Sequence, residues 1–131
     1  MFKKFGCFII LLFLVPIVQA QFFDNFSDGN FTTNPTWQTP QPADWVVNPV
    51  FQLQSNNTIA NSTFYISTPS TLATVAQWEF FSQLTFNPSG ANYADVFLNA
   101  SGSDLSATAT NGYFVRLGNT DDEISLWRKD G

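Results

Sequence analysis

Histidine is absent from the 131 residues, and cysteine occurs once, at Cys7. Without histidine the chain offers neither a Ser-His-Asp nor a Cys-His catalytic arrangement, and it has no imidazole ligand for a metal. Basic residues are also scarce, with five Lys and Arg against ten Asp and Glu. Because nucleic-acid binding depends on basic side chains that neutralise phosphates, nucleic acid is not an expected partner.

The first twenty residues have the organisation of a secretory signal peptide. Lys3 and Lys4 form a short basic region, and an unbroken apolar run follows over residues 8–15. Val18 and Ala20 suit the −3 and −1 positions of a cleavage site, so we predict cleavage after Ala20. The apolar run is shorter than the ~20 residues of a membrane-spanning helix. We therefore expect export to the medium or the outer cell surface without stable membrane insertion; an uncleaved N-terminal anchor is the alternative.

Cleavage would leave residues 21–131 as one domain without cysteine. Its only basic residues would be Arg116, Arg128 and Lys129, while all ten acidic residues remain. A domain exported without disulfides must be stabilised by its core alone. Burial of about two thirds of the unfolded surface makes that feasible at this chain length.

The mature region has the pattern of an all-β protein. Short runs of β-branched and aromatic residues alternate with polar ones and are separated by turn sequences such as Asn111-Gly112. This spacing predicts an antiparallel β-sandwich or jelly roll, with a loop over residues 101–110. The predicted strands cover residues 22–26, 45–47, 51–54, 63–67, 77–86, 91–99, 113–117 and 123–128.

The last residues resemble the beginning of a further hairpin. Asp130-Gly131 is a turn sequence that normally leads into a partner strand. We therefore expect the sandwich to be incomplete at its C-terminal end, as a fragment of a longer protein. The alternative is that the last strand is an edge strand.

The final hairpin has a register that its hydrophobic pattern predicts. Pairing Leu117 with Ile124 leaves a four-residue loop over 119–122 and puts the aliphatic side chains on one face. A shift of one residue would place Glu123 among them. The opposite face, together with the preceding strand, then carries six aromatic and charged side chains: Tyr93, Asp95, Phe97, Phe114, Arg116 and Trp127.

These six residues have three interpretations. In the first, the aromatic rings pack inside the sandwich and Asp95 pairs with Arg116 at its rim. In the second, they line an outer face that binds a polysaccharide or cell-surface glycan, because rings suit the C–H faces of sugars and charged groups bind hydroxyls. In the third, the face binds a partner protein.

Two acidic groups are candidate calcium ligands. Asp24 and Asp28 lie near a turn sequence, but an EF-hand beginning at Asp24 is excluded because Phe26 occupies its third position. A looser site formed with backbone carbonyls remains open. Asp121 and Asp122 form the other group, for which a solvated turn is the alternative. We expect no other cofactor.

A glycosidase pair of carboxylates is not evident. Jelly-roll glycosidases of the laminarinase type carry Glu-x-Asp-x-x-Glu on one strand, whereas here Glu123 is followed by Ser125 and Arg128 at the two acidic positions. Glu79, the only other glutamate, lacks acidic partners at those spacings. The residues therefore predict no enzymatic activity for this chain, although a missing downstream domain could be catalytic.

Four segments of the mature region have a recognisable pattern: 23–31 (FDNFSDGNF), 34–37 (NPTW), 111–118 (NGYFVRLG) and 120–128 (TDDEISLWR). Together they resemble concanavalin A-like (laminin G-like) modules of secreted and cell-surface proteins of Bacteroidota. The resemblance implies a jelly roll that is non-catalytic in itself and belongs to a long multi-domain protein, in some relatives with lamin-tail domains and a gliding-associated C-terminal sorting signal. It further implies glycan binding, adhesion or spacing between domains; the alternative is a targeting module attached to a downstream hydrolase or nuclease.

Overall fold

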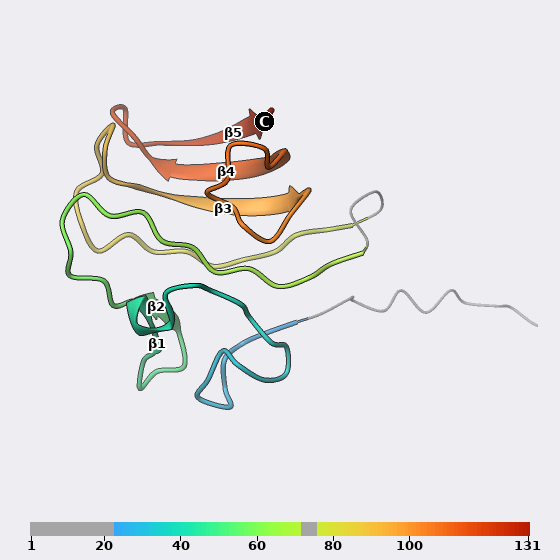
Figure 1. The fold of residues 1–131 in the computed structure, drawn as a ribbon. Coiled ribbons are helices and arrows are strands. Elements are labelled where there is room, and N and C mark those ends of the chain that lie inside the picture. The colour runs from blue at the N-terminus through green and yellow to red at the C-terminus, as the bar shows by residue number, and fades with distance from the viewer. Residues whose placement is uncertain (1–22, 72–75) are drawn as a thin grey trace, which may run out of the picture.

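The computed structural model describes residues 23–71 and 76–131 (Figure 1). The predicted signal peptide, residues 1–20, and the cleavage position at Ala20 lie outside this range. Within it, the only helical element is a single 3₁₀ turn, η1 (Pro42–Asp44). No helix in the described part of the chain is long and apolar enough to cross a membrane.

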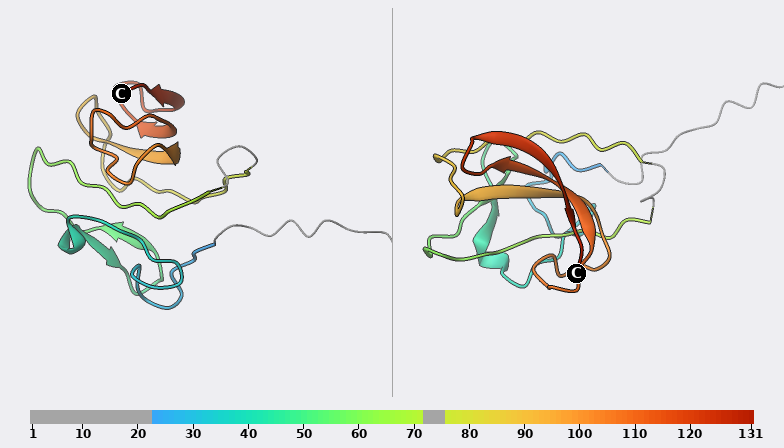
Figure 2. Two further views of the ribbon diagram at one scale, coloured as in Figure 1. Left: turned by 45° about the vertical axis from the view of Figure 1, so that its right-hand side comes forward. Right: turned by 90° about the horizontal axis from the view of Figure 1, so that it is seen from above.

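In the described residues, five strands form two antiparallel sheets. Strands β1 (Trp45–Val47) and β2 (Leu53–Ser55) make a small hairpin. Strands β3 (Tyr93–Ala100), β4 (Gly112–Gly118) and β5 (Glu123–Lys129) make the larger sheet, with β4 in the middle. Extended stretches before and after the gap at 72–75 run between the two sheets in Figure 1 and in the left view of Figure 2. The prediction of an all-β, antiparallel, sandwich-like fold is confirmed.

Most of the predicted strands in the first two thirds of the chain differ from the observed ones. The prediction for 45–47 matches β1, and those for 91–99, 113–117 and 123–128 match β3, β4 and β5 to within two residues. The prediction for 51–54 is displaced, since β2 covers Leu53–Ser55. The predictions for 63–67 and 77–86 are wrong: Ser67 makes one isolated bridge to Gln38, and 77–86 belongs to no sheet.

The prediction of a strand over 22–26 is wrong for its described part, which is irregular and leads into a turn at 27–28, and local side-chain hydrogen bonds explain why. The Phe26 backbone N–H donates to Asp24 Oδ1 at 2.7 Å, and the Ser27 N–H donates to Asn25 Oδ1 at 3.1 Å. Such contacts between residues two apart compete with a sheet ladder for the backbone donors. Along 77–86 the rings of Trp78 and Phe81 are largely exposed, so the apolar pattern there does not mark a buried strand face.

The register of the C-terminal hairpin is as predicted. Leu117 pairs with Ile124, Phe114 with Trp127, and the connecting loop covers residues 119–122. Gly118 precedes this loop with φ +97°, and a Cβ placed there would lie 2.5 Å from Cβ of Pro88. Glycine is therefore required at this point both by backbone conformation and by space.

The most buried apolar side chain lies on the mixed aromatic face of the larger sheet. Phe114 is 6% exposed, whereas Ile124 and Leu126, on the aliphatic face, are 76% and 68% exposed. Among the described residues no large side chain is completely buried. The aliphatic face of β5 is thus open to solvent.

The predicted loop between β3 and β4 is confirmed and is held by specific contacts. Asp104 Oδ1 accepts hydrogen bonds from the Ser106 hydroxyl at 2.6 Å and from the Ser106 and Ala107 backbone N–H groups at 2.9 and 3.1 Å. These hydrogen bonds, that of the Ser106 hydroxyl first, hold the pKa of the Asp104 carboxyl below its ordinary value. Lys129 Nζ, at the end of β5, donates to the carbonyls of Leu105 and Ala107 at 3.0 and 2.8 Å.

Candidate functional site

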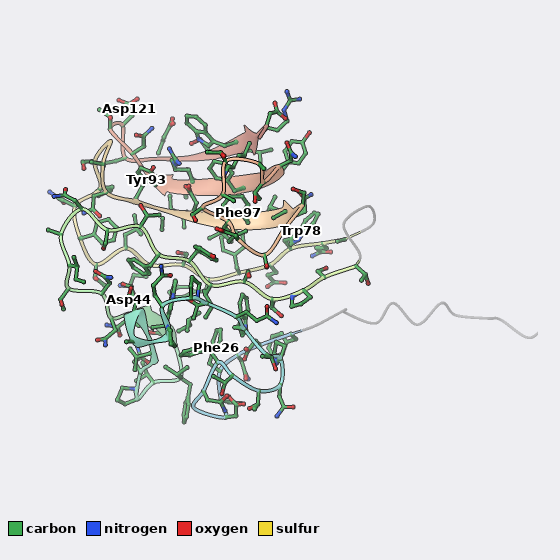
Figure 3. All side chains as sticks on the ribbon, in the orientation of Figure 1. Phe26, Asp44, Trp78, Tyr93, Phe97 and Asp121 are labelled. Atoms are coloured by element: carbon green, nitrogen blue, oxygen red, sulfur yellow. The ribbon has the colours of Figure 1, made fainter. Side chains whose placement is uncertain are left out.

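The six residues proposed for a ligand-binding face come together on one face of the larger sheet. Strand pairing puts Asp95 opposite Arg116, and Phe97 opposite Phe114, which in turn faces Trp127. Two of these residues, Tyr93 and Phe97, are labelled on β3 in Figure 3. We call this set the aromatic platform: Tyr93, Asp95, Phe97, Phe114, Arg116 and Trp127.

An ion pair lies at the centre of the aromatic platform. Arg116 donates from Nε to Asp95 Oδ1 and from Nη2 to Asp95 Oδ2, both at 2.8 Å. The side chains of Arg116 and Asp95 are 16% and 22% exposed, so water screens the pair only in part. Hydrogen bonding to Asp95 raises the pKa of Arg116 above its ordinary value. The two-pronged geometry fixes the plane of the guanidinium group.

Three aromatic rings surround this guanidinium group. Arg116 Cζ lies 3.7 Å from the ring centroid of Tyr93, 4.9 Å from that of Trp127 and 5.4 Å from that of Phe114. A cation at these distances is attracted by the negative faces of the rings. Arg116 therefore connects all three strands of the sheet through its contacts.

The other side of the aromatic platform is a row of stacked rings. Phe97 and Phe114 have centroids 4.9 Å apart, and Phe114 and Trp127 are 6.3 Å apart with an interplanar angle of 14°. Trp127 Nε1 donates to the hydroxyl of Ser125 at 2.7 Å, which restrains the indole. Ser125 was not among the predicted site residues. Its position two residues before Trp127, on the same strand face, is the sequence signal for this contact.

The aromatic platform contains one buried ring and two exposed rings that project to solvent. Phe114 is buried, while Tyr93 and Trp127 remain 39% and 40% exposed on either side of Arg116. The first interpretation, rings packed inside with an ion pair at the rim, describes Phe114 and the Asp95–Arg116 pair. It does not describe Tyr93 and Trp127, whose rings present apolar surface to solvent beside partly exposed charged groups.

The N-terminal acidic candidates are occupied by contacts within their own loops. Asp24 Oδ2 accepts a hydrogen bond from Trp37 Nε1 at 2.8 Å, while its other oxygen accepts from Phe26. Asp28 Oδ1 accepts from the Asn30 backbone N–H at 3.2 Å. These carboxylates therefore organise the loop around residues 24–37.

The acidic residues of the last hairpin lie elsewhere. Asp121 and Asp122 are exposed in the loop between β4 and β5, and Figure 3 places Asp121 at the opposite end of the molecule from Phe26. The two acidic groups thus form no common site. Across 23–71 and 76–131, no three or more His, Cys, Asp or Glu side chains are grouped closely enough to hold a metal ion.

Comparisons with protein families, curated proteins and solved structures found no relative of this chain. No family model matches the chain, and no curated protein or solved structure matches it. The aromatic platform therefore has to be interpreted from its own geometry.

Proposed function

We propose that this chain is an exported, non-catalytic β-sandwich module that binds neutral polysaccharide through the aromatic platform and so attaches a larger surface or secreted protein to glycans. The observation that carries the proposal is the pair of projecting rings, Tyr93 and Trp127, on either side of the Asp95–Arg116 pair. The concanavalin A-like jelly-roll topology and the relationship to Bacteroidota modules belong to the same proposal.

Aromatic rings and fixed polar groups are the two features that sugar recognition requires. A pyranose presents a C–H face that packs on an aromatic ring, and hydroxyls at its edge that hydrogen-bond to charged groups. Tyr93 and Trp127 supply the rings, and the guanidinium group of Arg116, paired with Asp95, contacts both rings.

The aromatic platform is held in place before any ligand binds. Asp95 fixes the guanidinium plane, and Ser125 restrains the indole of Trp127. Ordering a free side chain on binding costs about 0.5–1.5 kcal/mol, so restraint of this kind favours affinity. Stacking on Phe114 provides a further restraint for Trp127.

Charge favours a neutral glycan over an acidic one. The cation of the platform is already paired with Asp95, and acidic residues outnumber basic ones two to one in the chain. A polyanion such as pectin would meet a negative field with no unpaired cation in the platform to offset it.

The direct test is retention on insoluble polysaccharides. The wild-type protein is incubated with cellulose, chitin, xylan, mannan and curdlan, and the bound fraction is measured after sedimentation. The test variant is Trp127→Ala. Trp78→Ala is the matched control, because Trp78 is 43% exposed, close to the 40% of Trp127, but lies outside the aromatic platform.

We expect the wild-type protein to be retained on at least one neutral polysaccharide. The bound fraction should fall at least tenfold in Trp127→Ala and stay unchanged in Trp78→Ala. Equal loss in both variants would indicate nonspecific adsorption through exposed aromatic rings. Equal retention by wild type and Trp127→Ala would remove the aromatic platform as the binding site.

A further inference from the structure

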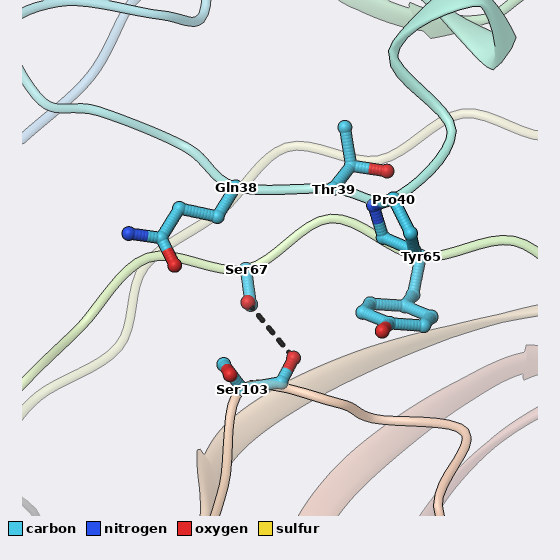
Figure 4. A pocket seen from close by; sticks show the side chains of 6 residues that line it. All are labelled: Gln38, Thr39, Pro40, Tyr65, Ser67 and Ser103. Carbon is cyan, nitrogen blue, oxygen red and sulfur yellow. Dashed lines mark hydrogen bonds between the residues drawn. The ribbon is translucent and has the colours of Figure 1, made fainter.

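A second concave site shares no residue with the aromatic platform and includes Ser103 of the β3–β4 loop. Its cavity has a volume of about 200 Å³ and opens to solvent. Figure 4 shows that it is built from three segments that are far apart in sequence. The lining residues are Gln38, Thr39, Pro40, Tyr65, Ser67 and Ser103.

Hydrogen bonds within the protein hold the walls of this cavity together. Gln38 and Ser67 exchange backbone hydrogen bonds of 2.7 and 2.9 Å, which join the first two segments. The Ser67 hydroxyl donates to the Ser103 carbonyl at 3.0 Å, as the dashed line in Figure 4 marks, and this contact brings in the third segment. The cavity is therefore formed without a ligand.

The lining offers uncharged hydrogen-bonding groups around one aromatic ring. The Gln38 carboxamide and the Ser103 hydroxyl have no hydrogen-bond partner among the residues that the structure describes. The Thr39 hydroxyl accepts from the Gln41 backbone N–H at 3.1 Å and can still donate its own proton. The ring of Tyr65 and the ring of Pro40 supply apolar surface.

The electrostatic surroundings disfavour an anion. Asp104 follows the lining residue Ser103 and lies close enough to Tyr65 to influence its hydroxyl, and the lining contains no basic side chain. Desolvation, followed by the influence of Asp104, raises the pKa of Tyr65 above its ordinary value, so its hydroxyl is uncharged at neutral pH.

We propose that this cavity binds one neutral sugar ring, with its C–H face against Tyr65 and its hydroxyls toward Gln38, Thr39 and Ser103. The volume is below the roughly 300–1,000 Å³ of common small-molecule pockets, which limits the ligand to about one ring. The site is independent of the aromatic platform and would stand if the platform bound nothing. Its ligand is either a free monosaccharide or the terminal residue of a glycan chain.

The test is a titration of the ¹⁵N-labelled protein, followed by NMR, with glucose, galactose, mannose and xylose and with their methyl glycosides. A saturable shift of the backbone resonances of Gln38, Tyr65 and Ser103 with at least one sugar is expected. If the methyl glycoside binds as well as the free sugar, the ligand is a chain terminus. If methylation abolishes binding, the ligand is the free sugar.

Variants separate this cavity from the aromatic platform. Gln38→Ala removes an exposed side chain but keeps the backbone contacts to Ser67, and should weaken binding by roughly two- to tenfold, the effect of one or two hydrogen bonds. Trp127→Ala should leave this titration unchanged. The proposal is overturned if no sugar gives a saturable shift, or if Gln38→Ala and Tyr65→Ala, each shown to be folded by its spectrum, bind as wild type does.

Discussion

The ion pair at the centre of the aromatic platform should contribute measurably to folding. Exposed pairs contribute ~0–1 kcal/mol, whereas removing one partner of a fully buried pair costs about 3–5 kcal/mol. The Asp95 and Arg116 side chains are only about one fifth exposed, and the pair is bidentate at 2.8 Å. We therefore expect a coupling energy of about 1–2 kcal/mol between them. Asp95→Ala should be the more harmful single change, because it leaves Arg116 unpaired between rings.

A double-mutant cycle measures this coupling directly. Wild type, Asp95→Ala, Arg116→Ala and the double variant are compared by denaturant unfolding followed by tryptophan fluorescence. The internal control is the same cycle on Arg128 and Asp130, whose side chains are 62% and 66% exposed and whose coupling should be smaller than that of Asp95 and Arg116 because water screens it. A coupling for Asp95–Arg116 no larger than that of the control pair would refute the reasoning.

Three further changes have expected outcomes. Gly118→Ala should lower the free energy of unfolding by at least ~1–2 kcal/mol, because φ is +97° and the new Cβ would press on Pro88; thermal unfolding measures it. Leu126→Lys should reduce self-association in light scattering without altering polysaccharide retention, because Leu126 is 68% exposed on the face opposite the aromatic platform. Because the pKa of Asp104 is lower in the folded than in the unfolded protein, the ionised carboxylate stabilises the fold at pH values above the unfolded-state pKa. This stabilisation is lost as the pH falls through the folded-state pKa. Protection of the Ala107 amide in hydrogen exchange should therefore decline below about pH 4.

The C-terminal part of the fold could be predicted because its information is local. Alternation of side chains along β4 and β5, with a four-residue loop between them, leaves one register in which Glu123 avoids the aliphatic face. That register brings Phe114 next to Trp127, and the pairing of β3 with β4 brings Arg116 next to Asp95, so the aromatic platform follows from the pairing of neighbouring strands.

The earlier part of the chain was harder to predict because side chains there accept hydrogen bonds from backbone N–H groups that a sheet would otherwise use. Asp24 and Asn25 take the N–H groups that a strand would need, and the apolar residues around Trp78 remain exposed. The sugar-sized cavity could not be predicted at all. It depends on contacts between residues 38, 67 and 103, and polar residues of these types give no pattern that links such distant positions.

The central claim is that glycan binds across Tyr93, Arg116 and Trp127, and the most direct measurement is of the indole N–H resonances by NMR. Oligosaccharides prepared from the retained polysaccharide are titrated into the ¹⁵N-labelled protein, and the Trp127→Ala variant assigns the Trp127 signal. We expect a saturable shift of the Trp127 indole and of the Arg116 Nε–H signal, with the Trp78 indole signal unmoved. A saturable shift of Trp78 that leaves Trp127 unchanged would contradict the central claim.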